Sequence, residues 1–171
     1  MTVVVSDTSP LHYLILCGAE TALPRLFRQV VIPPPVFREL QQPNTPPAVR
    51  EWAHSLSMWA TGQTPKALNL SLDVDAGELE AICLAQEIKA AAVLMDDRAG
   101  RNAAVQCGLA VIGTVGLLEQ AAARGLLDLP QVMARLRQTD ARLDPELIHA
   151  ALKRAKARRQ ARPSGSGQAD T

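Results

Sequence analysis

The sequence is poor in the residues that bind zinc or form disulfide bonds. Among its 171 residues there are three histidines, scattered along the chain, and neither a C-x-x-C nor an H-E-x-x-H motif occurs. There are also three cysteines, which lie far apart in apolar helical contexts: Cys17, Cys83 and Cys107. We therefore expect free, buried thiols in a reducing compartment. Any metal bound here would have oxygen ligands rather than sulfur or imidazole.

Signals for secretion or membrane insertion are also lacking. No apolar run approaches the roughly 18 residues of a membrane span, and the N-terminus has no basic region followed by a long apolar core. The expectation is a cytoplasmic protein without membrane contact. A chain of 171 residues forms one domain of ordinary size, which buries enough apolar surface to fold without a disulfide or a metal.

The net charge of +1 hides an uneven distribution. Residues 1–152 hold twelve basic and sixteen acidic groups, whereas six basic residues with no acid among them follow directly: Lys153, Arg154, Lys156, Arg158, Arg159 and Arg162. The Ser/Gly/Gln composition from Pro163 onward is typical of disorder. We expect a folded domain over 1–154 and a basic, then disordered tail over 155–171. The tail is either a solvated end or a surface for a polyanion.

Apolar strands alternate with amphipathic helices along the chain. The runs at 3–5, 29–32, 91–95 and 110–113 are short and rich in β-branched residues, and helical spacing follows each of them. A further short edge strand is possible near 58–60. This alternation predicts an α/β fold, a three-layer α/β/α domain with a central parallel sheet.

Two of these strands end in carboxylates. Asp7 follows the first strand, and Asp96 and Asp97 follow the run at 91–95. Ligands and metals collect at the carboxyl edge of parallel sheets, so the positions favour function. The alternative is that each Asp only caps the next helix; after Asp7, Thr8 or Ser9 is the expected cap, with Pro10 in the first turn.

Two glutamates lie on apolar faces of predicted helices. Glu39 stands three positions after Val36, along the inward stripe of its helix, unless it reaches solvent from the edge of that stripe. Glu78 falls among apolar residues on the helical wheel, and Glu80 falls on the polar face. The spacing of Asp75 and Glu78 also matches a capping box, which would explain Glu78 without any function.

The fold could bring these acids to one edge of the sheet: Asp7, Glu39, Glu78, Asp96 and Asp97. Several carboxylates within about 4–6 Å of one another repel, raise one another's pKa and destabilise the fold. A divalent cation removes that conflict. Oxygen-only ligation with room for water suits Mg²⁺ or Mn²⁺, which prepare water for attack on a phosphodiester.

At these residues the sequence resembles PIN domains, the small metal-dependent nuclease fold of the VapC-type toxins in bacterial and archaeal toxin–antitoxin pairs. The resemblance covers about residues 2–154, and five segments carry it in the expected order: 5–11, 32–40, 72–85, 94–101 and 111–118. Each segment is weak alone, and the combination is specific.

The resemblance implies an endoribonuclease that hydrolyses RNA phosphodiester bonds with Mg²⁺ or Mn²⁺, as the toxin of a VapBC-type pair. It implies RNA as substrate, a small antitoxin protein as partner, and a homodimer. Asp7 would be the central metal ligand, and Glu39 and Glu78 would complete the acidic cluster.

The fourth acid is either Asp97, which aligns better with the family, or Asp96, which lies nearer the strand end. Both are candidate metal ligands beside Asp7. Thr8 or Ser9 would orient Asp7 or a water through a hydroxyl, and Glu80 is an alternative to Glu78 in the alignment. Arg98 and Arg101 are the expected RNA contacts.

A rival hypothesis comes from another class of function. A PIN-like fold can serve as an RNA-binding or protein-assembly module with little catalysis, its basic tail making the contacts. The complete set of acids in this sequence argues against that reading. Binding of Mn²⁺ that depends on Asp7 would separate the two.

Overall fold

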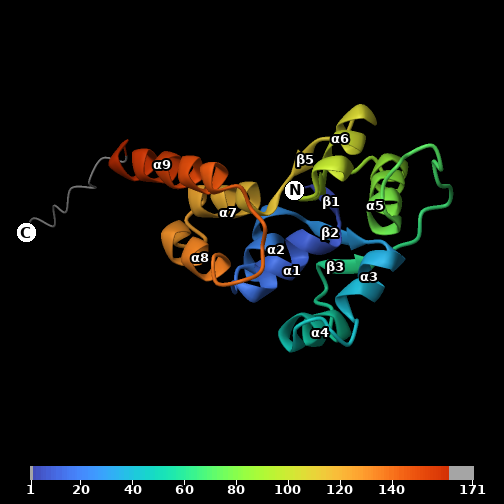
Figure 1. Cartoon of the computed structure of the whole chain (residues 1–171), viewed down its shortest axis with the longest axis horizontal. Coiled ribbons are helices and arrows are strands. Elements are labelled where there is room, and N and C mark those ends of the chain that lie inside the picture. The colour runs from blue at the N-terminus through green and yellow to red at the C-terminus, as the bar shows by residue number, and fades with distance from the viewer. Residues whose placement is uncertain (1, 162–171) are drawn as a thin grey trace, which may run out of the picture.

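The computed structural model describes residues 2–161 and has a five-stranded parallel sheet at its centre (Figure 1). Its strands are β1 (Val3–Ser6), β2 (Gln29–Ile32), β3 (Ala60–Gly62), β4 (Ala92–Leu94) and β5 (Val111–Ile112). They lie side by side in the order β3-β2-β1-β4-β5, with every neighbouring pair parallel. The predicted edge strand exists as β3, and β1 occupies the middle of the sheet.

Helices connect the strands and cover both faces of the sheet. They are α1 (Thr8–Leu16), the 3-10 turn η1 (Glu20–Ala22), α2 (Leu23–Leu26), α3 (Pro34–Leu40), α4 (Pro47–His54), α5 (Ala76–Glu87), α6 (Arg98–Gln106), α7 (Thr114–Ala123), α8 (Leu129–Leu136) and α9 (Pro145–Ala161). Pro33 is the N-cap of α3, as the run of three prolines predicts. Gly18 ends α1 with a φ of 68°, a left-handed conformation that glycine adopts without strain.

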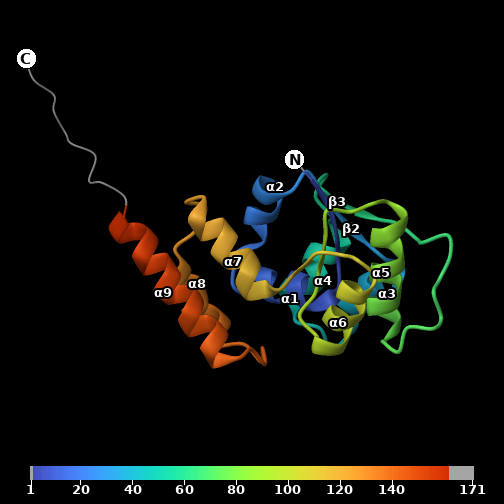
Figure 2. The same cartoon turned by 90° about the horizontal axis from the view of Figure 1, so that it is seen from above.

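The two faces of the sheet have separate cores, because alternate strand residues point to opposite sides. Val4 and its neighbours pack with α1, α4 and α7, whereas Val5 and Val93 pack with α5 and α6. Figure 2 shows α5 and α6 on one side of the sheet and α1 and α7 on the other. The predicted three-layer α/β/α architecture is confirmed.

The cysteines do not all behave as predicted. All three are free, and Cys17 and Cys83 are buried, but Cys107 is only half-buried. Cys107 follows the last turn of α6, where the helix reaches the surface, so the expectation of a buried thiol is wrong there. Among the described residues, no helix is both long and apolar enough to cross a membrane.

Helices α8 and α9 pack on α7 and extend the molecule away from the sheet (Figures 1 and 2). Helix α9 buries Ala151 completely and leaves Ala155 9% exposed. The domain boundary expected after residue 154 therefore falls inside this helix. Residues 162–171, which include the stretch expected to be disordered, lie outside the described residues.

Much of the basic stretch is engaged within the fold. Arg154 and Arg158 both contact Glu119 of α7, with N–O distances of 2.7 and 3.2 Å. Arg159 contacts Asp128 at 2.7 Å. The hydrogen bonds from Arg154 and Arg158, that of Arg154 first, lower the pKa of Glu119 below its ordinary value. The three ion pairs fix the face of α9 that meets α7, and Lys153 and Lys156 of the same helix are exposed.

The packing of α9 gives a stability prediction. An Asp at position 151 would bury an unpaired charge, so Ala151→Asp should lower the free energy of unfolding by about 3 kcal/mol or more. Ala157→Asp is the matched control, because Ala157 is exposed on the same helix, and it should change stability by less than about 1 kcal/mol. Urea unfolding measures both variants. Equal effects would show that α9 is not packed as described.

Candidate active site

The site is centred on Asp7, which stands where β1 ends in the middle of the sheet. The backbone N–H of Asp7 donates to the carbonyl of Leu94 at 2.9 Å, so the pairing with β4 continues into this residue. Asp7 is also the N-cap of α1, and its side chain makes no capping hydrogen bond. The cap expected at Thr8 or Ser9 is therefore wrong, because α1 begins immediately after the last sheet hydrogen bond.

From β1 the chain adds β2 and β3 on one side, and it then crosses over to place β4 and β5 on the other side of β1. Such a reversal of strand order opens a crevice at the carboxyl ends of the strands. Asp7 lies at this point and is only 6% exposed.

Thr8 links Asp7 to Glu39 on the neighbouring helix α3. The Thr8 hydroxyl donates a short hydrogen bond to the Glu39 carboxylate. Glu39 is half-buried, and the Thr45 hydroxyl donates to its backbone carbonyl at 2.9 Å. The inward glutamate on α3 thus has a hydroxyl partner one residue away from Asp7.

Glu78 is buried on the first turn of α5, with 4% of its surface exposed. It also forms the capping box: its N–H donates to Asp75 Oδ1 at 2.8 Å, and the Asp75 N–H donates to Glu78 Oε2 at 3.2 Å. The structural and the functional explanations of this residue are therefore compatible. Glu80 is half-exposed, and its Oε2 is covered without a hydrogen-bond partner in the described chain, so the expected orientation toward water holds for only part of that side chain.

Asp96 and Asp97, which follow β4, point to different helices. Asp96 is half-buried and accepts from the backbone N–H of Thr114 at 2.8 Å and from its hydroxyl at 2.6 Å, at the start of α7. Asp97 is exposed and caps α6, accepting from the N–H groups of Ala99 and Gly100 at 2.8 and 3.1 Å.

The arginines after β4 differ in their surroundings. Arg101 is half-buried, and its Nη1 donates to the carbonyl of Met95 at 2.8 Å, which fixes the end of β4. Arg98 is exposed at the first position of α6 and makes no hydrogen bond or ion pair with the described residues.

Sequence reasoning missed three residues that shape the site: Asp75, Gly100 and Thr114. The sequence pattern explains Asp75 only as a cap. In the structure, a Cβ placed on Gly77 would lie 3.3 Å from Asp7 Oδ1 and 3.4 Å from Asp75 Oδ1, so both acids approach one point. A Cβ on Gly100 would lie 2.9 Å from Glu78 Oε1, so only glycine lets α6 approach that carboxylate. Thr114, the third, had no signal beyond its position after a predicted strand.

The electrostatics of Asp7 follow from its position. Burial raises the pKa of Asp7 to about 7, opposed by a backbone hydrogen bond at Thr8 and reinforced by the negative charges of Asp75, Glu39 and Asp96. The carboxylate is therefore held where ionisation costs free energy.

Glu78 has the same property. Burial raises its pKa to about 7, opposed by the backbone hydrogen bond at Asp75 and reinforced by the charges of Asp75, Asp97 and Asp7. The charge of Asp7 thus acts on Glu78, and neither acid forms an ion pair within the described chain.

The carboxylates around Asp7 are the possible ligands of a cation at this site. Within residues 2–161, no group of three acidic, histidine or cysteine side chains converges closely enough to hold an ion as placed. The donors at the site are all carboxylate oxygens, and Mg²⁺ is commonly bound by one or two carboxylates while it keeps several waters. The chemistry of the site therefore fits a hydrated Mg²⁺ or Mn²⁺.

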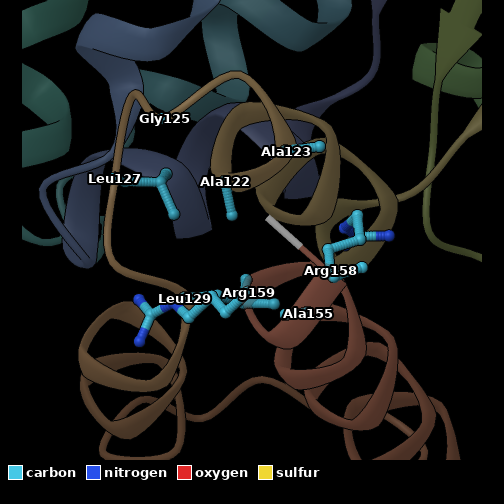
Figure 3. Close-up of a pocket in the computed structure, with 9 residues that line it drawn as sticks. Ala122, Ala123, Gly125, Leu127, Leu129, Ala155, Arg158 and Arg159 are labelled. Carbon is cyan, nitrogen blue, oxygen red and sulfur yellow. The ribbon is translucent and has the colours of Figure 1, made fainter. Parts of the chain in front are cut away.

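A different pocket, of 390 Å³, lies between α7 and α9 (Figure 3). Ala122, Leu127 and Leu129 form its apolar part, and Arg158 and Arg159 border it. None of the clustered acids lines it, so it is separate from the site around Asp7.

The raised pKa values predict how the metal-free protein responds to pH. The folded state keeps protons on Asp7 and Glu78 that the unfolded state has lost, so the contribution of these two groups to stability is largest at low pH and falls between about pH 4 and about pH 7. Each group accounts for at most about 4 kcal/mol. Asp7→Asn should flatten this fall. Urea unfolding in chelator across this range measures it, and an unchanged slope in the variant would contradict the assignment.

Comparison with known proteins identifies the family of this chain. A sequence model described as a PIN domain matches residues 3–157, nearly the whole described chain. No curated protein and no solved structure gave a match. The five-stranded parallel sheet with helices on both faces agrees with the architecture of that family. By this match, the chain belongs to the PIN-domain family.

Proposed function

We propose that the protein is a metal-dependent endoribonuclease whose site is centred on Asp7. One observation carries the proposal: Asp7 and Glu78 are buried carboxylates at the carboxyl edge of the sheet, and neither has a cationic partner among the described residues. Burying such groups together is costly unless something positive joins them. The nuclease-type fold of the PIN-domain family supports hydrolysis of a nucleic acid.

The proposed metal is Mg²⁺ or Mn²⁺. Asp7 would hold it with Asp96, whose charge acts on the Asp7 carboxylate, or with Asp97, whose charge acts on Glu78. When bound, the cation would lower the pKa of water at the site and shield the charge of the scissile phosphate.

The other residues of the site would position these groups. Thr8 holds the Glu39 carboxylate and so fixes it beside Asp7. Glu78 lies close enough to Asp7 for the charge of Asp7 to raise the pKa of Glu78. Arg98 and Arg101 are the proposed RNA contacts, and Arg98 is the more accessible of the two.

The proposal includes the role of a toxin in a VapBC-type pair. Its partner would then be a small antitoxin protein, and the active form a homodimer in the cytoplasm. The three free cysteines favour such a reducing compartment. The neighbouring reading frame should encode the antitoxin, and expression of the two proteins together should relieve the growth arrest caused by this chain alone.

Asp7→Asn should abolish cleavage without unfolding the protein. The change keeps the shape of the side chain and removes the charge that would bind the cation, so the rate should fall at least about 100-fold. A mixed RNA pool with Mn²⁺ serves as substrate, and circular dichroism checks the fold. Equal cleavage by Asp7→Asn and the wild type would refute the mechanism.

Three further variants locate the remaining acids. Glu80→Gln is the control on α5 and should retain most activity, whereas Glu78→Gln should lose it. Asp96→Asn should reduce cleavage more than Asp97→Asn, because asparagine still caps α6 at position 97. Loss of activity in Glu80→Gln alone would move the third acid from Glu78 to Glu80.

Metal should stabilise the wild type and not Asp7→Asn. A cation bound only by the folded state adds about 2.7 kcal/mol when its concentration is about 100 times its Kd. Thermal melts above about pH 7, with chelator or with millimolar Mn²⁺, measure the difference. If millimolar metal does not shift the wild-type melting temperature, the carboxylates do not form a shared metal site.

A further inference from the structure

A polar cleft of 540 Å³ extends from the acidic site along α1. Thr8 and Glu39 form the end next to Asp7, and His12 lines it one helical turn further along. Asn44 and Asp140, the latter in the segment between α8 and α9, also line it. The volume is in the range that holds a nucleoside-sized ligand.

The charge of the cleft excludes a phosphate as its occupant. No lysine or arginine lines it, and its lining includes two acidic residues, Glu39 and Asp140. A phosphodiester would be repelled by both groups. An uncharged ligand with N–H donors would instead meet two carboxylates that accept hydrogen bonds.

The walls are fixed by hydrogen bonds within the chain. The Thr45 hydroxyl donates to the carbonyl of Glu39 at 2.9 Å, which ties the segment after α3 to that helix. Near Asp140, the Thr139 hydroxyl donates to the carbonyl of Leu136 at 2.6 Å and accepts from the Ala141 N–H at 3.2 Å. The cleft is therefore formed before any ligand arrives.

His12 provides a flat surface within the cleft. Its ring packs edge-on against Tyr13, with centroids 5.0 Å apart and planes inclined by 72°. Burial, partly offset by the charge of Asp140, lowers the pKa of His12 below its ordinary value, so the imidazole is neutral at neutral pH. Neutral rings of this kind stack with unpaired bases of RNA.

We propose that this cleft binds the base of a nucleotide adjoining the scissile phosphate, and that Asp140 selects guanine. A carboxylate has two acceptor oxygens, and guanine is the RNA base whose edge offers two neighbouring donors, its ring N–H and its amino group. Asn44 supplies a further donor and acceptor, and His12 stacks on the base. The claim that this base adjoins the cut rests on the proposed function. The claim that the cleft binds the base does not.

The first experiment measures the base alone. Guanosine, adenosine, cytidine and uridine are titrated into the metal-free full chain, and NMR shifts of His12 and Asn44 report binding. Guanosine should bind about tenfold or more tightly than uridine, and Asp140→Asn should remove that difference. Glu51→Gln, an exposed acid on α4 outside the cleft, should leave it unchanged. Equal binding of all four nucleosides would overturn the proposal.

The second experiment maps cleavage sites in a randomised RNA with Mn²⁺. The wild type and Glu51→Gln should show guanine enriched at one position beside the cut, and Asp140→Asn should lose the enrichment. Cleavage without base preference by the wild type would overturn the cleft assignment alone. A wild type that cuts no RNA would overturn the proposed function, and the nucleoside titration would then decide the cleft by itself.

Discussion

The burial of the Asp7 carboxylate at the centre of a parallel sheet is the constraint on which the site depends. Asp7 ends β1, and β1 lies between β2 and β4, so helices from both faces close around that position. Loss of water is the main cause of its raised pKa. A fold selected only for stability would place an apolar residue there. The carboxylate therefore indicates that stability is given up for function.

The acids around Asp7 are each held by a different helix end. Thr8 at the start of α1 binds Glu39, Asp75 binds Glu78 at the start of α5, and Thr114 at the start of α7 binds Asp96. Helix N-termini carry partial positive charge, which suits carboxylates. This arrangement keeps the acids apart in the metal-free chain and leaves them within electrostatic reach of one another. The site is thus preorganised by local capping interactions rather than by direct contacts between its acids.

A cluster of basic residues lies on α9. Helix α9 lies beyond α7, on the side away from the α5 and α6 layer (Figure 2). Glu119 and Asp128 fix three of its arginines, while Lys153 and Lys156 remain exposed. The polar cleft that contains Thr8, Glu39 and Asp140 adjoins the acidic site, and no lysine or arginine lines it. That division separates groups that would hold a phosphate from groups that would recognise a base.

The sequence by itself determined the order of strands and helices, the parallel sheet and the burial of Asp7 and Glu78, because hydrophobic periodicity and turn residues act over a few positions. Tertiary structure alone decided that Asp7 rather than Thr8 caps α1, that α9 is packed through Ala155, and that Asp140 and His12 line the same cleft. These features depend on residues distant in the sequence. The cap depends on the hydrogen bond between Asp7 and Leu94, and the position of α9 depends on its packing against α7. The cleft depends on the segment after α8, which brings Asp140 to it. No local pattern encodes such pairings, since their free energy arises only when the elements meet.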